Sequence, residues 1–182
     1  MRPLPTNRLA LTLLSVIFSI PRSYYRIRYR RVELGKHVLI AGRLRITGSI
    51  RVRIGDGCRI GKGVQISGGG SLDIGPNTFL NGPWIHADTT ISIGRDCLLS
   101  ACQVVDTDFH NVDPASRHEA LSANGAAPIT IAHNVWIGGG AMILKGVHIG
   151  PDSVVGAGTI VRRDVPERVV VIGNPQVIVR QL

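Results

Sequence analysis

The chain has 182 residues, which is enough for one domain with a substantial hydrophobic core. Only 4% of the residues are aromatic while 22 are glycine, so Val, Ile and Leu must fill the core in a regular, narrow space. The formal charge of +9 is uneven: residues 1–60 contain 13 Lys or Arg and 2 acidic residues, whereas residues 61–182 contain 8 and 10. This distribution argues against a protein whose whole surface binds nucleic acid.

Three cysteines, Cys58, Cys97 and Cys102, are present, and no two of them form a Cys-x-x-Cys pair. An odd number without such a pair predicts reduced, mostly buried thiols in a cytosolic protein. The same spacing predicts that the cysteines do not hold a structural zinc ion.

Residues 1–36 are predicted to form an N-terminal helical arm. The apolar stretch "LALTLLSVIFSI", residues 9–20, is shorter than the ~20 residues that span a membrane, and no small-x-small cleavage site follows it. The next stretch, "RSYYRIRYRR", mixes arginine with tyrosine. This order predicts peripheral contact of residues 9–31 with an anionic cytoplasmic membrane surface. Packing of the arm on the domain or on a neighbouring subunit is an alternative that stays open, and nucleic-acid binding is not expected.

From Ile131 to Val161 an apolar residue returns every six positions, and a small or β-branched residue often follows four positions later. A period of six fits neither a helix nor an alternating strand. It predicts a triangular prism in which each unit gives one short strand and one corner, three units close a coil, and coils stack by parallel pairing at ~4.8 Å. A parallel β-solenoid is therefore expected over residues 37–166, followed by a tail over residues 167–182.

Earlier repeats keep the period but slip in register. Their registers are expected to be Ile54–Ile60–Ile66, Ile74–Leu80 and Ile93–Leu99–Val105. Each slip predicts a corner insertion or a small bulge.

Residues 106–128, "DTDFHNVDPASRHEALSANGAAP", interrupt the rhythm. A long excursion from a regular solenoid is more often functional than accidental. The excursion contains His110 and His118, and a neutral imidazole is the natural general base near pH 7. Asp106 or Asp108 could orient that imidazole or terminate the coil, and both interpretations stay open.

The stretch "ITIAHNVWIGGGAMILKGVHIGPDSVVGAGTIVRRDVPERVVVIGNPQVIVR" resembles the C-terminal half of the hexapeptide-repeat acyltransferases. The nearest subgroup in pattern is the maltose, galactoside and polysaccharide O-acetyltransferases, and the resemblance covers about residues 37–180. It implies an all-β, left-handed parallel β-helix with an extruded loop, assembled as a homotrimer. It also implies acetyl-coenzyme A as co-substrate in clefts between subunits, with no metal.

The resemblance also assigns roles to single residues. "DTDFH" is similar to the Asp-x-Asp-x-His form of polysaccharide-modifying members and makes His110 the catalytic base. For the coenzyme, the matched positions are Trp136, Gly138, Gly139, Ala157, Arg162, Arg163 and Arg180. For the acceptor, they are Asn81, Trp84, Asp88 and Asp108. Pro83 replaces a second asparagine expected in the acceptor segment, and Gly139 replaces a serine that is common in the family.

Together these features predict a cytoplasmic, acetyl-coenzyme A-dependent O-acetyltransferase. In it, His110 activates a hydroxyl of a sugar or polysaccharide precursor for direct attack on the thioester. An N-acetyltransferase acting on an amino sugar and a non-catalytic solenoid scaffold are the alternatives. Two metal-dependent classes fit less well. The Asp-x-Asp pair of glycosyltransferases belongs to α/β nucleotide folds, and the His-x4-His pair of β-helical carbonic anhydrases is absent from the sequence.

Overall fold

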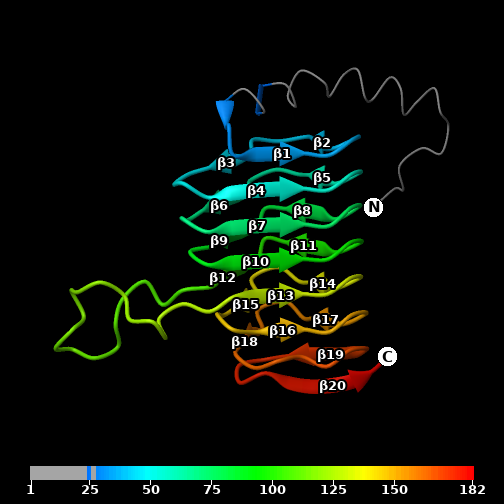
Figure 1. The fold of residues 1–182 in the computed structure, drawn as a ribbon. Coiled ribbons are helices and arrows are strands. Elements are labelled where there is room, and N and C mark those ends of the chain that lie inside the picture. Colours follow the sequence, from blue (N-terminus) through cyan, green and yellow to red (C-terminus); the bar gives the residue numbers. More distant parts are fainter. Residues whose placement is uncertain (1–23, 26–27) are drawn as a thin grey trace.

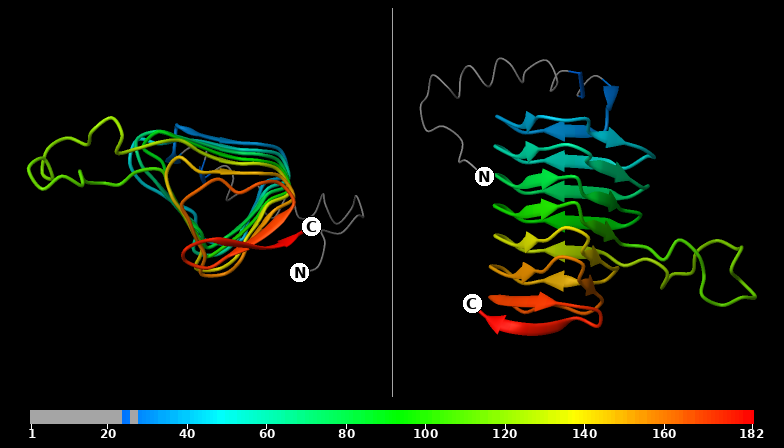
Figure 2. Two further views of the ribbon diagram at one scale, coloured as in Figure 1. Left: turned by 90° about the horizontal axis from the view of Figure 1, so that it is seen from below. Right: turned by 180° about the vertical axis from the view of Figure 1, so that it is seen from behind.

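The computed structural model describes residues 24–25 and 28–182 of the chain. In this part of the chain, short strands wind into a three-sided prism (Figure 1). The chain runs through three sheets in turn, so each sheet gains one strand per coil. Seen along its axis in Figure 2, the prism has a triangular outline, with one long loop leaving from a corner. The predicted parallel β-solenoid is therefore confirmed.

The three faces are named sheets A, B and C. Sheet A contains β1 (Val32–Leu34), β4 (Arg51–Ile54), β7 (Ser71–Ile74), β10 (Thr90–Ile93), β13 (Ile129–Ile131) and β16 (His148–Ile149). Sheet B contains β2 (Leu39–Ile40), β5 (Arg59–Ile60), β8 (Phe79–Asn81), β11 (Leu98–Ser100), β14 (Trp136–Ile137), β17 (Val154–Val155), β19 (Val169–Ile172) and β20 (Val177–Gln181). Sheet C contains β3 (Arg45–Ile46), β6 (Gln65–Ser67), β9 (Trp84–His86), β12 (Gln103–Val105), β15 (Met142–Ile143) and β18 (Ile160–Val161).

Aliphatic ladders fill the prism. On sheet A, Ile54, Ile74, Ile93, Ile131 and Ile149 pair in register from coil to coil, and each is almost fully buried. Sheets B and C carry equivalent ladders of Ile, Leu and Val. Stacking of like aliphatic side chains fills most of the core, and Tyr25 is its one buried aromatic residue in the described part of the chain, which explains the composition.

One corner of the prism is longer than the others in the early coils. From sheet C to sheet A the inward residues Ile66 and Ile74 are eight positions apart, whereas Ile143 and Ile149, in the coils after the loop, are six apart. These extra residues produce the slips in the sequence. The expected register was wrong at Val105, because the corner before β12 is one residue short and Val104 pairs in line with Ile85 and Ile143.

The corner between sheets C and A is called the C/A edge, formed by residues 47–50, 67–70, 87–89, 106–128, 144–147 and 162–164. The corner between sheets B and C is called the B/C edge, formed by residues 41–44, 61–64, 82–83, 101–102, 138–141 and 156–159. Each edge is continuous along the prism, so residues far apart in sequence lie above one another.

The solenoid is longer at both ends than predicted. It extends into the residues predicted as the N-terminal arm and into those predicted as the C-terminal tail. The first strand, β1, begins at Val32 and pairs with β4. At the other end β19 continues sheet B in parallel, and β20 closes that sheet as its antiparallel edge strand.

The apolar stretch 9–20 lies outside the described residues. Within the described part of the chain, no helix has both the length and the apolar character needed to cross a membrane.

We predict that Ile85→Ala lowers the free energy of unfolding by about 2–5 kcal/mol, because it deletes fully buried side-chain volume from a ladder. Urea unfolding followed by circular dichroism measures the change. Val112→Ala, at a loop position that is 81% exposed, is the control and should change stability by less than about 0.5 kcal/mol. Equal unfolding midpoints for the two variants would contradict the ladder as the source of stability.

Candidate active site

The loop of residues 106–128 leaves the C/A edge between β12 and β13 and projects far from the prism (Figures 1 and 2). Its two ends pair with each other. Thr107 and Ala126 form an antiparallel bridge, the Asp108 amide donates to the Gly125 carbonyl at 2.8 Å, and a further backbone bond closes the base. The loop therefore begins as a short two-stranded stem rather than as free chain.

Asn111 ties the outer part of the loop together. Its side chain is 9% exposed; its Nδ2 donates to the carbonyls of Ser116 and Ala120, and its Oδ1 accepts from the Ser122 amide. A buried amide that uses both its donor and its acceptor functions fixes the backbone around it. The adjacent residue, His110, is held by this network.

His110 itself is exposed. It lines a hollow of about 370 Å³ together with Asp108, Asn111, Asp113 and Lys145. Within the described part of the chain, no hydrogen bond to its imidazole is formed. Both ring nitrogens are thus free to meet a ligand or a neighbouring subunit.

Neither nearby aspartate orients that imidazole within the chain. The Asp106 carboxylate is buried and accepts from the amides of Asp88 and Thr89, both at 2.8 Å, and from the Thr89 hydroxyl at 2.6 Å. Asp108 forms an ion pair with Lys145 at 2.5 Å. Asp106 thus terminates the coil, which was one of the two interpretations of the sequence, and Asp108 anchors the loop.

Lys145 completes the anchor, because its ammonium group also donates to the Asn124 carbonyl at 2.6 Å. It belongs to the coil that follows the loop. The loop is therefore bound to the prism through its stem and through this lysine.

A series of polar side chains in contact with one another runs across sheet C toward Asp88. Trp84 Nε1 donates to Ser67 Oγ at 3.3 Å, and Ser67 Oγ lies 2.8 Å from His86 Nδ1. His86 Nε2 lies 3.2 Å from Asp88 Oδ1. The angle at this contact is unsuitable for a hydrogen bond, so Nε2 has no hydrogen-bond partner among the described residues. The Gly69 amide donates to the same Asp88 oxygen at 3.3 Å. Asp88 is held from two sides, with its side chain 41% exposed.

Phe109 connects this series of polar side chains to the loop of residues 106–128. Its ring lies 4.7 Å from His86 and stacks parallel to Trp84 at 6.3 Å, measured between ring centroids. Its backbone has a φ of 65°, an unfavourable region for a bulky residue. The packing of its ring on sheet C offsets that strain and leaves the next residue, His110, facing outward.

The residues matched to the coenzyme lie elsewhere. Trp136 is 51% exposed on sheet B, and Gly138, Gly139 and Ala157 follow on the B/C edge. A Cβ on Gly138 would lie 2.7 Å from the Ala157 amide nitrogen, so only glycine allows the two coils to approach so closely. A Cβ on Gly139 would meet only the Ser100 carbonyl oxygen at 3.7 Å, so packing does not require glycine there.

The three arginines matched to the coenzyme do not all lie in the same region of the prism. Arg162 and Arg163 are exposed at the C/A edge of the last coil, where both backbone amides donate to Gln176 Oε1. Arg180 is exposed on β20 of sheet B. Their guanidinium groups carry charge that no acidic residue neutralises in the described part of the chain.

The predicted site residues therefore form two groups within one chain. The first group, at the C/A edge and the adjoining part of sheet C, is Trp84, Asp88, Asp108, His110, Arg162 and Arg163. The second group, on sheet B and the B/C edge, is Asn81, Trp136, Gly138, Gly139, Ala157 and Arg180. Sheet B does not border the C/A edge, so the width of sheet C separates the groups.

All three thiols are buried, as expected from the sequence. Burial raises the pKa of Cys58 to about 11 and that of Cys102 to about 12, and it also raises the pKa of Cys97. Such thiols are poor nucleophiles. Across the described residues, no group of three or more His, Cys, Asp or Glu side chains could hold a metal ion.

Sequence reasoning missed two residues that build the site: Asn111 as the centre of the loop and Lys145 as its anchor. It named Asp106 but did not identify the 88–89 turn as its partner. Asn111 carries a weak signal, since it stands beside the candidate base. The partners of Asp106 and Lys145 lie 17 or more positions away, at distances set by coil stacking.

Comparison with known proteins agrees with this architecture. The family described as "Bacterial transferase hexapeptide (six repeats)" matches residues 128–163. The chain is 38% identical over 118 residues to the galactoside O-acetyltransferase of Escherichia coli, covering 63% of this chain and 56% of that protein.

Two solved structures are also similar. The polysialic acid O-acetyltransferase OatWY has a TM-score of 0.71 and 29% identity over 82% of this chain and 74% of that one. A hexapeptide-repeat acetyltransferase from Vibrio cholerae, solved with acetyl-coenzyme A, has a TM-score of 0.62 and 26% identity over 95% and 87%.

The six-residue period, the three parallel sheets and these similarities define a hexapeptide β-solenoid. The chain is similar to the hexapeptide-repeat acetyltransferases, and the family model itself matches residues 128–163. The chain spans only about half the length of the curated relatives that it matches.

We predict that the native protein resists alkylation by iodoacetamide at pH 8. With a pKa of about 11, the thiolate fraction of Cys58 is only about 10⁻³ at that pH, and burial also blocks access. Mass spectrometry should find three modified cysteines after denaturation in urea and essentially none before it. Rapid native modification of any of the three would show a reactive thiol.

Proposed function

We propose that the protein transfers the acetyl group of acetyl-coenzyme A to a hydroxyl group of a sugar or polysaccharide precursor. The observation that carries this proposal is the exposed imidazole of His110, held on an internally bonded loop whose Phe109 ring stacks on Trp84. The names of the relatives support it, since two are O-acetyltransferases of galactosides and of polysialic acid. The Vibrio cholerae relative binds the proposed donor.

His110 would act as general base. One imidazole nitrogen takes the proton of the acceptor hydroxyl while the oxygen attacks the thioester carbonyl carbon. The tetrahedral intermediate then collapses, the carbon–sulfur bond breaks, and the imidazolium returns the proton to the coenzyme A sulfur. Direct transfer fits the buried, protonated thiols, which offer no nucleophile for an acetyl-enzyme.

The second group of residues, with Arg162 and Arg163 supplied by the first group of a neighbouring subunit, fits a long, phosphorylated thioester. The exposed face of Trp136 and the side-chain-free surface at Gly138 and Gly139 would accept the pantetheine arm. Arginine suits the distal phosphates because its planar fork binds them through paired hydrogen bonds. Arg162, Arg163 and Arg180 would supply these contacts.

The separation of the two groups supports an assembled site. We propose that the C/A edge of one subunit meets sheet B and the B/C edge of the next, so that base and coenzyme converge between chains. A head-to-tail contact of this kind closes into a ring when the rotation fits, and three copies give the expected homotrimer.

On the acceptor side, the Asp88 carboxylate would hydrogen-bond sugar hydroxyls, while Trp84 would contact the ring face. Asn81 belongs to the second group, at the end of β8. It would therefore reach the acceptor from the neighbouring subunit. An imidazole base suits a hydroxyl acceptor, which must lose its proton during attack. The protein would work in the cytoplasm, with residues 9–31 contacting the inner face of the membrane.

We predict that His110→Ala lowers kcat roughly 10²–10⁴-fold, since it removes the general base. Acetyl-coenzyme A affinity, measured by calorimetry, should stay within about twofold because His110 is not one of the proposed coenzyme contacts. His118→Ala is the matched control: another exposed histidine of the same loop, expected to keep full activity. Normal turnover by His110→Ala would exclude the role of base. A wild-type chain that binds no coenzyme A would instead indicate a non-catalytic scaffold.

We predict that mixed oligomers of His110→Ala and Trp136→Ala subunits recover activity that each variant lacks alone. With random mixing in equal amounts, about a quarter of the interfaces pair an intact His110 with an intact Trp136. Co-expression with two affinity tags, followed by an acetyl-transfer assay, measures this recovery. A site contained in one chain predicts no recovery, and full activity of Trp136→Ala alone would contradict its place at the coenzyme.

A further inference from the structure

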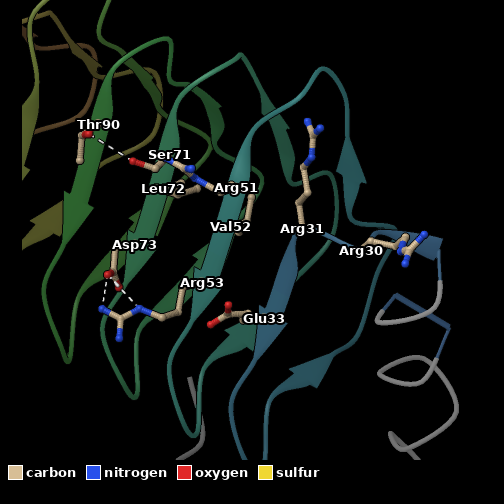
Figure 3. A pocket seen from close by; sticks show the side chains of 10 residues that line it. All are labelled: Arg30, Arg31, Glu33, Arg51, Val52, Arg53, Ser71, Leu72, Asp73 and Thr90. Atoms are coloured by element: carbon tan, nitrogen blue, oxygen red, sulfur yellow. Dashed lines mark hydrogen bonds and ion pairs between the residues drawn. The ribbon is translucent and has the colours of Figure 1, made fainter.

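A row of hydrogen-bond donors crosses the outer face of sheet A near the beginning of the prism. Figure 3 shows Arg31, Arg51, Ser71 and Thr90 following one another across adjacent strands. They line a hollow of about 410 Å³. The hydroxyl oxygens of Ser71 and Thr90 lie 3.2 Å apart. Two guanidinium groups beside two hydroxyls form a surface suited to phosphate oxygens.

The next outward row on the same strands is different. It contains Glu33, Arg53 and Asp73, and Arg53 is bonded to Asp73 through Nε and Nη2. Charges in that row neutralise one another, whereas the row of Arg31 and Arg51 contains no acid. The hollow therefore has one neutralised side and one side with an excess of positive charge (Figure 3).

This excess continues around the first coils. The set called the basic end comprises Arg28, Arg30, Arg31, Lys36, Arg43, Arg45, Arg51, Arg53, Arg59 and Lys62. Residues 28–62 contain only two acids, whereas residues 71–182 contain seven Lys or Arg and ten acids. Among the described residues of this set, only Arg53 forms an ion pair with a carboxylate.

The basic end surrounds the prism instead of following one face. Arg51 stands on sheet A, Arg59 on sheet B and Arg45 on sheet C, all at about the same level. A ring of cations at one end of a prism fits a flat anionic surface that the end faces. A linear polyanion would instead need a stripe of cations along one face.

We propose that the basic end docks the solenoid onto an anionic phospholipid surface, with headgroup phosphates seated against the row of Arg31 and Arg51. This contact extends the membrane contact proposed for residues 9–31 to the folded coils, and it does not depend on the proposed acetyl transfer. Each basic residue near such a surface contributes roughly fivefold in binding, an effect that salt screens. The surface belongs to folded coils, so it is distinct from the apolar stretch 9–20.

The full-length protein tests this proposal by co-sedimentation with vesicles of phosphatidylcholine, with or without phosphatidylserine. The variant is Arg43→Gln/Arg45→Gln/Arg51→Gln. The control is Arg95→Gln/Arg117→Gln/Arg168→Gln, three exposed arginines beyond the basic end that change the net charge equally. Unchanged urea midpoints establish that both variants fold.

We expect binding that requires phosphatidylserine and falls about 10²-fold in the first variant, with little change in the control. Equal losses in the two variants, or no loss in the first, would overturn the proposal. So would binding of soluble polysialic acid or heparin without any binding to vesicles. Inorganic phosphate at matched ionic strength should compete only weakly, because a single phosphate cannot contact the whole ring.

Discussion

Parallel pairing between successive coils is the constraint on which the rest of the molecule depends. It places each inward aliphatic residue directly above its counterpart one coil earlier, as in the isoleucine ladder of sheet A. Because every coil repeats the one before it, each corner becomes a continuous edge. Residues at one edge are thereby aligned along the axis, whatever their separation in the sequence.

The C/A edge is the corner at which the chain departs most from the repeat. In the early coils this edge holds additional residues, and in the fourth coil it releases the loop that carries His110. The first coil, which carries part of the basic end, and the coil that carries that loop are three coils apart, which corresponds to roughly 14 Å along the axis. A chain docked through its first coils would therefore hold the candidate base close to the lipid headgroups.

The sequence alone was sufficient to predict the solenoid, the bounds of the loop and the burial of Cys58, Cys97 and Cys102, because a six-residue period leaves few alternatives. It could not predict the contacts that arise between coils. Asp106 meets Thr89, and Lys145 meets Asp108, only because stacking brings those positions together. The register at Val104 was missed for a related reason: a corner shortened by one residue leaves the apolar pattern almost unchanged. The division of the site residues into two groups depends on which face each strand occupies, which periodicity does not specify.

The network around Asn111 bears on the thermodynamics of ligand binding. Ordering a flexible loop on binding would cost roughly 1–2 kcal/mol for each residue that becomes fixed. Here the amide side chain of Asn111 bonds to three backbone groups, and the stem and Lys145 fix the base of the loop. Most of that entropy is therefore lost when the chain folds. A ligand arriving at His110 would meet a surface already in place, and its affinity would not be weakened by the ordering of the loop.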